Sequence, residues 1–64
     1  MFVELTLRHR GNRVLVNTNT IESIIEETDG TCKVVITTEG SNQPITVKET
    51  YDEIKKAVLS GGNV

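Results

Sequence analysis

The stretch from residue 21 to residue 38 reads IESIIEETDGTCKVVITT, and it decides the fold. Asp29-Gly30 within it is a strong hairpin turn signal, because these residue types tolerate the positive φ angles of tight hairpin turns. Residues 32–38 are dominated by valine, isoleucine and threonine, which suit a pleated surface. Residues 21–27 fit either one helical face or strand alternation. Such a short isoleucine-rich run between two turn signals favours a strand, and a helix remains the alternative.

The residues before this stretch predict another hairpin. Residues 2–8 alternate between apolar and polar side chains, which is the pattern of a half-buried strand. Gly11 can supply the positive φ of a turn, and the β-branched run of residues 13–16 then returns alongside. The side chains that we expect to face inward are Val3, Leu5, Leu7, Val14 and Val16.

The remaining segments complete a meander. Residues 17–20 are polar side chains that can bond their own backbone, which favours a turn. Residues 40–44 are predicted to be a loop, and residues 45–48 a final short strand with Pro44 at its start. Five short strands joined by short loops would form an antiparallel β-meander.

The end of the chain changes to a helical period. Thr50 and Glu53 match a capping box, in which each side chain bonds the other residue's backbone N–H. A helix over residues 51–59 would carry one apolar stripe that packs on the sheet, and Gly61-Gly62 would end it. The stripe consists of Tyr51, Ile54, Ala57 and Val58. The fold class is therefore α+β, with a single domain over residues 1–60 and a disordered tail at residues 61–64.

The size of the chain limits its stability. A chain of 64 residues buries only about 60% of the surface that it exposes when unfolded, and small domains usually need an additional source of stability. Cys32 and His9 are the sole cysteine and histidine, so neither an internal disulfide nor a metal site made by these two residue types is available. We expect no cofactor. Self-association is the remaining way to stabilise the fold.

Charge and hydropathy restrict the partners. The net charge of −2 and the pI near 5.2 give no general attraction to phosphate backbones. No apolar run approaches the length of a membrane span, and the N-terminal residues lack the pattern of a secretory signal. The unpaired Cys32 agrees with a reducing compartment, so we expect a cytoplasmic protein.

Some apolar side chains exceed what one short helix can cover. They fall on the outer face of the predicted strands or beside the helix stripe, and a contiguous apolar patch usually marks an interface. We therefore predict a second subunit on that face or along an open strand edge, which makes the protein a homo-oligomer. The predicted interface residues are Leu15, Ile24, Val35 and Leu59.

The clearest polar cluster is the first hairpin turn. Arg8, Arg10 and Arg13 lie close together there with His9, and guanidinium groups can grip phosphate oxygens. No second basic run and no interleaved aromatic residue accompanies them, so nucleic acid is the disfavoured partner. His9 has no nucleophile or acid at a recognisable spacing, and Cys32 begins an apolar strand, so we do not expect an enzyme.

Turn glycines, strand residues and the helix start follow one another in a distinctive order along the chain. The residues that make up this order are Leu5-Thr6, Gly11, Val16-Asn17, Ile21-Glu22-Ser23-Ile24, Asp29, Ile36, Gly40, Val47-Lys48-Glu49 and Asp52-Glu53-Ile54. In this order the chain resembles the FlbD-type family of small bacterial proteins. The resemblance covers residues 2–59 and implies a cytoplasmic accessory role in flagellar motility without a defined reaction or site. We therefore predict a non-enzymatic protein-interaction module. The alternative is a nucleic-acid-binding or regulatory protein that uses the arginine hairpin, with a phage as one source of such a protein.

Overall fold

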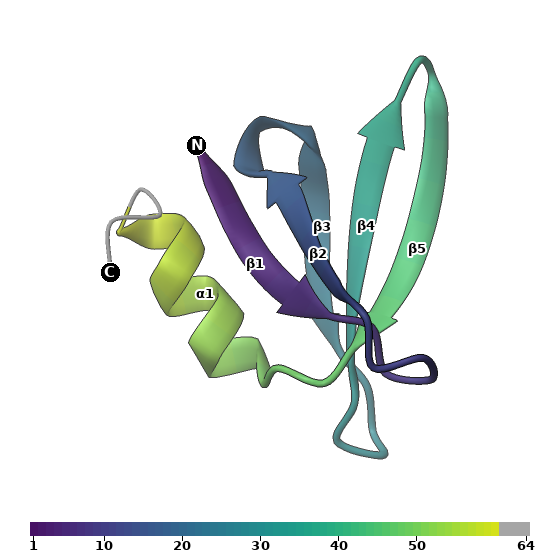
Figure 1. Cartoon of the computed structure of the whole chain (residues 1–64), viewed down its shortest axis with the longest axis vertical. Coiled ribbons are helices and arrows are strands. Elements are labelled where there is room, and N and C mark those ends of the chain that lie inside the picture. The colour runs from purple at the N-terminus through teal and green to yellow at the C-terminus, as the bar shows by residue number, and fades with distance from the viewer. Residues whose placement is uncertain (61–64) are drawn as a thin grey trace.

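The computed structural model describes residues 1–60, in which five antiparallel strands precede an α-helix (Figure 1). This architecture confirms the predicted α+β class and the order of its elements. The strands are β1 (Phe2–Thr6), β2 (Arg13–Asn17), β3 (Ile21–Glu26), β4 (Cys32–Thr38) and β5 (Ser41–Val47), and the helix is α1 (Tyr51–Leu59). No helix in the described residues is both long and apolar enough to cross a membrane.

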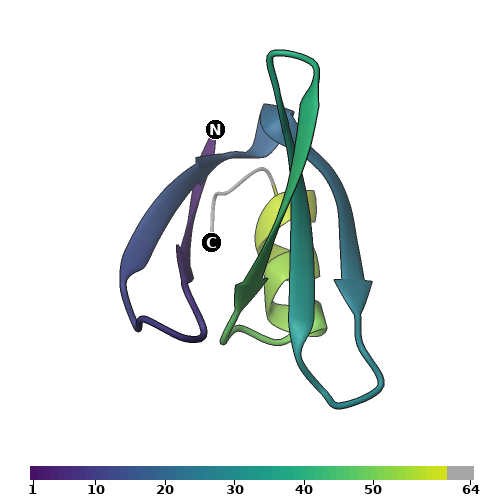
Figure 2. The same ribbon diagram turned by 90° about the vertical axis from the view of Figure 1, so that its right-hand side faces the viewer.

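The strands form a β1-β2 hairpin and a three-stranded sheet in the order β3-β4-β5. A 3-10 turn at Thr18–Thr20 carries the chain from one sheet to the other, and it is capped by the Asn17 side chain, which accepts from the Asn19 N–H. The two sheets meet where Leu7 bridges Val47. They spread apart from this junction, and α1 lies across the open side (Figures 1 and 2).

The core lies between the two sheets and the helix. Ile54 is 1% exposed and lies beneath the strands, and Tyr51, Ala57 and Val58 pack beside the core. The predicted apolar stripe of the helix is confirmed, and so is its capping box at Thr50. The buried hydrophobic residues are Val3, Leu5, Val16, Cys32, Val34, Val47 and Ile54. The predicted helix end at Gly61-Gly62 and the predicted disorder of residues 61–64 lie outside the described residues.

Strand β3 contains an irregularity that the alternation did not reveal. The residues are a strand as favoured, but the β3–β4 register shifts between Ile21 and Ser23. A bulge of this kind adds one residue to the strand and moves the following side chains to the opposite faces. Ile21 and Ile24 therefore both pack against the core, and Ile25 is the exposed isoleucine at 43%. The expectation that Ile24 faces outward was wrong for this reason.

The β4–β5 hairpin is tighter than expected. The predicted loop at residues 40–44 was wrong, because the turn consists of Glu39 and Gly40, with φ of 47° and 82°, and β5 starts at Ser41. Pro44 thus lies inside β5 rather than at its start. Thr46 accepts a hydrogen bond from the Arg8 N–H on the side away from β4. By strand alternation Pro44 faces that same open edge, where no ladder N–H is lost.

Candidate functional site

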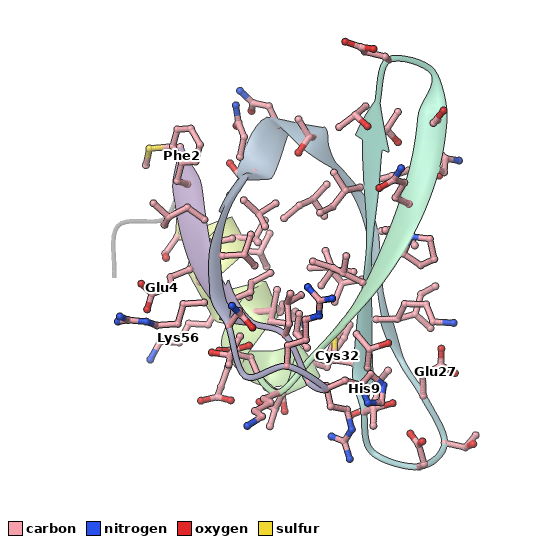
Figure 3. All side chains as sticks on the ribbon, turned by 45° about the vertical axis from the view of Figure 1, so that its right-hand side comes forward. Phe2, Glu4, His9, Glu27, Cys32 and Lys56 are labelled. Atoms are coloured by element: carbon pink, nitrogen blue, oxygen red, sulfur yellow. The ribbon has the colours of Figure 1, made fainter. Side chains whose placement is uncertain are left out.

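The outer side of the β1-β2 hairpin carries large exposed apolar side chains. Phe2 is 59% exposed and Leu15 is 66% exposed. Glu4 pairs with Leu15 across the two strands, and Phe2 pairs with Asn17, so Phe2 and Leu15 are diagonal neighbours on one surface. We call this surface the hairpin face, and Figure 3 shows Phe2 and Glu4 on its β1 side. Its residues are Phe2, Glu4, Arg13, Leu15 and Asn17.

The outer side of the three-stranded sheet is less apolar. Val35 is half-buried there and pairs with Ser23 on one side and Pro44 on the other. Ile25 pairs with Lys33, whose ammonium group lies 3.3 Å from Glu27 Oε1. Charged and hydroxyl side chains therefore interrupt the apolar residues on this side, which makes it a weaker candidate than the hairpin face.

The predicted interface residues do not form one patch. Leu15 is on β2, Val35 on β4 and Leu59 at the end of α1, where it is 74% exposed. Ile24 is half-buried and packs against the core. The helix ends on the side of the molecule where β1 begins (Figures 1 and 2).

Sequence reasoning missed three exposed apolar residues, Met1, Phe2 and Ile25. Phe2 could have been found, because it precedes the inward-facing Val3 and must point to the opposite face of the strand. Ile25 could not have been found from alternation, because its direction depends on the bulge between Ile21 and Ser23. The signal for Phe2 was present in the same period-two pattern that identified the strand.

The arginines of the first hairpin are all exposed, but they do not form a purely basic surface. Arg8 borders an open hollow of about 360 Å³ between the β1–β2 turn and the β3–β4 turn. Figure 3 shows His9 and Glu27 at this end of the molecule. Arg10 and Arg13 are not part of the hollow. Its lining consists of Arg8, His9, Glu27, Thr28, Asp29, Thr31, Lys33 and Thr46.

Two carboxylates offset the basic groups in this hollow. Glu27 pairs with Lys33, as described above. Asp29 Oδ1 accepts hydrogen bonds from the Thr31 hydroxyl at 2.7 Å and the Thr31 N–H at 3.0 Å. These two bonds hold the pKa of Asp29 below its ordinary value, so the group stays ionised beside Arg8. A phosphate approaching the hollow would meet negative as well as positive charge, which weakens the case for nucleic acid.

Cys32 lies in the interior, with an exposed fraction of 1%. Burial raises the pKa of its thiol above the ordinary value, and the carboxylates of Glu26 and Glu27 raise it further. Both effects favour the neutral thiol over the nucleophilic thiolate. Within residues 1–60, no three His, Cys, Asp or Glu side chains are grouped so that they could hold a metal ion.

Comparison with known proteins gives no match to a family model, to a curated protein or to a solved structure.

Proposed function

We propose that this protein is a non-enzymatic interaction module that associates with further copies of itself. The observation that carries the proposal is the hairpin face, where Phe2 and Leu15 expose 59% and 66% of their surface on a regular two-stranded ladder. Exposed apolar side chains that lie together on one surface mark a site of association. A second protein chain would remove both side chains from water.

The small core supports this proposal. Seven hydrophobic residues are buried among residues 1–60, and three of them, Val3, Leu5 and Val16, belong to the two-stranded hairpin. An isolated two-stranded hairpin has little stability of its own, and domains of this size gain from a partner subunit. Association through the hairpin face would therefore stabilise the part of the fold with the fewest strands.

Sedimentation velocity at micromolar concentrations tests self-association directly. The chain has a mass of 7.1 kDa, and we expect a species of at least twice that mass that dissociates on dilution. Circular dichroism on the same samples establishes that the protein is folded. A folded monomer at every concentration up to about 100 μM would contradict the proposal, because any association would then contribute less than about 5.5 kcal/mol.

The cellular role that we propose is a cytoplasmic accessory function in flagellar motility. It is supported by the FlbD-type resemblance over residues 2–59 and by nothing in the site itself. The neighbouring genes test it: flagellar motor and hook genes beside this gene would agree with the role, and phage structural genes would contradict it.

A nucleic-acid-binding role is the second candidate, and the exposure of Arg8, Arg10 and Arg13 is the observation that favours it. We expect binding to labelled DNA or RNA to be weak even at low salt, because Glu27 and Asp29 flank Arg8. Tight, salt-sensitive binding that is lost in an Arg10→Ala/Arg13→Ala variant would reverse the ranking of the two candidates. Thr28→Ala, which leaves every charge in place, serves as the control.

A further inference from the structure

Strand β2 has one open edge, and hydrogen bonds elsewhere show which backbone groups point to it. Within residues 1–60, β2 pairs with β1 alone. The Leu7 N–H donates to the Asn12 carbonyl, and the Thr18 N–H donates to the Met1 carbonyl. Even-numbered residues from 12 to 18 therefore face β1. Because neighbouring residues in a strand point their backbone groups in opposite directions, Arg13, Leu15 and Asn17 present theirs on the open edge.

The other strand edges carry features that oppose pairing with another chain. Pro44 removes an N–H from the open edge of β5. The bulge after Ile21 distorts β3, whose exposed side chains include Glu22 and Glu26. Thr6 on the outer edge of β1 is already occupied, because its N–H donates to Glu49 and its carbonyl accepts from Lys48. Proline, bulges and charged side chains are the usual means of protecting a sheet edge.

The open edge of β2 carries fewer of these protections, and they lie at its two ends, where Arg13 is charged and the Asn17 carbonyl accepts from the Thr20 hydroxyl. Its residues Arg13–Asn17 include no proline and no register shift, and Arg13 at its start is the strand's one charged side chain. The middle residue is Leu15, which is 66% exposed. An edge that is regular and apolar at its centre is a template for strand addition.

We propose that two copies of this chain pair through β2, antiparallel, with the two-fold axis at Leu15, so that each hairpin becomes half of a four-stranded sheet. This inference rests on the proposed self-association and specifies its geometry. Leu15 of one copy would lie opposite the partner's Leu15, and Arg13 opposite the partner's Asn17. Each of these pairs can exchange backbone N–H and carbonyl hydrogen bonds, because all three residues face the open edge. The Asn17 carbonyl also accepts from the Thr20 hydroxyl, so it would bond the partner through its second lone pair.

The side chains agree with this register on both faces. On the hairpin face the two Leu15 side chains would contact each other, and Arg13 would meet an amide rather than a second guanidinium. On the inner face Val14, which is half-buried, would lie beside the partner's Val16 and extend the core. A second copy fits the edge because it places no like charges opposite each other and covers apolar surface on both sides of the sheet.

Cysteine cross-linking tests the register. In an antiparallel hydrogen-bonded pair the Cα atoms are about 5.5 Å apart, which a disulfide can span. We expect Leu15→Cys to form a disulfide-linked dimer under mild oxidation. Arg13→Cys is the matched control, because two copies of residue 13 would lie about four residues apart along the strands, or roughly 13 Å. The native Cys32 is 1% exposed and remains in both variants.

The outcomes separate this inference from the proposed function. Efficient cross-linking of Leu15→Cys and not of Arg13→Cys would support the β2 pairing. Equal cross-linking of both variants, or of neither, would overturn it even if sedimentation shows a dimer, and the proposed self-association would then stand on another surface. A monomeric wild-type chain would remove both.

Hydrogen exchange on the unmodified protein provides a second measurement that does not depend on a variant. The Leu15 amide should exchange at least tenfold more slowly at a concentration where the dimer forms than after dilution, because its N–H becomes bonded to the partner. The Ile24 amide is the comparison, because it faces the open edge of β3, which takes no part in the proposed pairing. Fast exchange at Leu15 in the dimer would rule out the β2 edge.

Discussion

Glu49 joins the β1-β2 hairpin to the segment that leads into the helix. Its Oε1 accepts from the Thr6 N–H and its Oε2 accepts from the Thr6 hydroxyl, both at 2.8 Å. Thr6 is partly buried, so its N–H would have no equivalent partner without this carboxylate. A side chain therefore supplies the hydrogen bonds that a neighbouring strand would supply in a closed sheet.

We expect Glu49→Ala to lower the free energy of unfolding by about 1–3 kcal/mol, the cost of leaving a partly buried donor unsatisfied. Urea unfolding followed by circular dichroism measures the change. Glu4→Ala is the control, because Glu4 is exposed on the same strand, and it should change stability by less than about 0.5 kcal/mol. If the two variants lost equal stability, the bonds to Thr6 would not be the cause.

At the scale of the elements, hydrogen bonds between neighbouring residues determine where the helix begins. At the start of α1, the Thr50 hydroxyl accepts from the Glu53 N–H at 3.2 Å, and Glu53 Oε1 accepts from the Thr50 N–H at 2.9 Å. The bond from the Thr50 N–H to the carboxylate, assisted by the Thr50 side chain, holds the pKa of Glu53 below its ordinary value of 4.5. Both bonds lie within the first helical turn, so they form wherever the backbone is helical there.

Acid should weaken this cap. A carboxyl group whose pKa is lower in the folded state stabilises that state at pH values above its ordinary pKa, and the contribution is lost as pH falls through the folded value. We expect the free energy of unfolding of the wild type to fall more than that of Glu53→Gln between about pH 5 and pH 3, because glutamine does not titrate. Urea unfolding at several pH values provides the comparison.

A control substitution on β1 separates the contribution of the Glu53 cap from the general effect of removing a carboxylate. Glu4→Gln removes another carboxylate, so it serves as the control for the loss of one negative charge. Parallel curves for the wild type and Glu53→Gln would show that the cap makes no pH-dependent contribution.

The β4–β5 turn contains a residue in an unfavourable backbone conformation. Glu39 has φ of 47°, in the left-handed region that side-chain-bearing residues other than asparagine and aspartate rarely adopt. Two consecutive positive φ angles, here at Glu39 and Gly40, are typical of the hairpin turn that prefers Asn-Gly. We expect Glu39→Asn to raise the free energy of unfolding by roughly 0.5–1 kcal/mol.

Thermal and urea unfolding measure this gain, and Gly40→Ala should have the opposite effect because φ at Gly40 is 82°. The space around Gly40 is open, so any loss in that variant comes from the backbone and not from a clash. A lower stability for Glu39→Asn would mean that the turn relaxes to another conformation in solution.

At the scale of the whole molecule, the two sheets touch at one end and are otherwise held by the core and α1. A dimer that extends the hairpin sheet would stabilise the folded chain by mass action. We expect the midpoint of thermal unfolding to rise by several degrees between about 5 and 500 μM protein. In Leu15→Lys this rise should disappear, because two lysines would face each other across the two-fold axis.

Leu59→Lys is the matched control, since Leu59 is 74% exposed on α1 and lies outside the proposed pairing. It should retain the concentration dependence of the wild type. A midpoint that does not depend on concentration for the wild type would contradict coupling between association and stability.

Much of this fold could be predicted because its determinants are local. The alternation of residues 2–8 identified Val3 and Leu5 as buried, and the spacing of Thr50 and Glu53 identified the start of α1. The errors occurred where local patterns were ambiguous. Polar residues before Pro44 suggested a loop, although an edge strand accommodates them, and the bulge reversed the faces of Ile24 and Ile25.

The candidate site was predicted in part. Leu15 and Leu59 were expected to lie outside the core, and both side chains are exposed. Ile24 was expected on the outer face of the sheet, but it packs against the core. The reason is the register shift, which depends on how β3 pairs with β4 and cannot be recognised from the alternation of residues in β3 alone.

The amino-acid sequence by itself determined the elements, since strand alternation, turn glycines and a helix cap act over a few neighbouring residues. Only the tertiary structure decided that the strands divide into two sheets and that β2 keeps an unprotected edge. Which strands become neighbours depends on contacts between distant residues, such as Leu7 with Val47 and Thr6 with Glu49. Those contacts form when the chain closes around its core, and no local pattern encodes them.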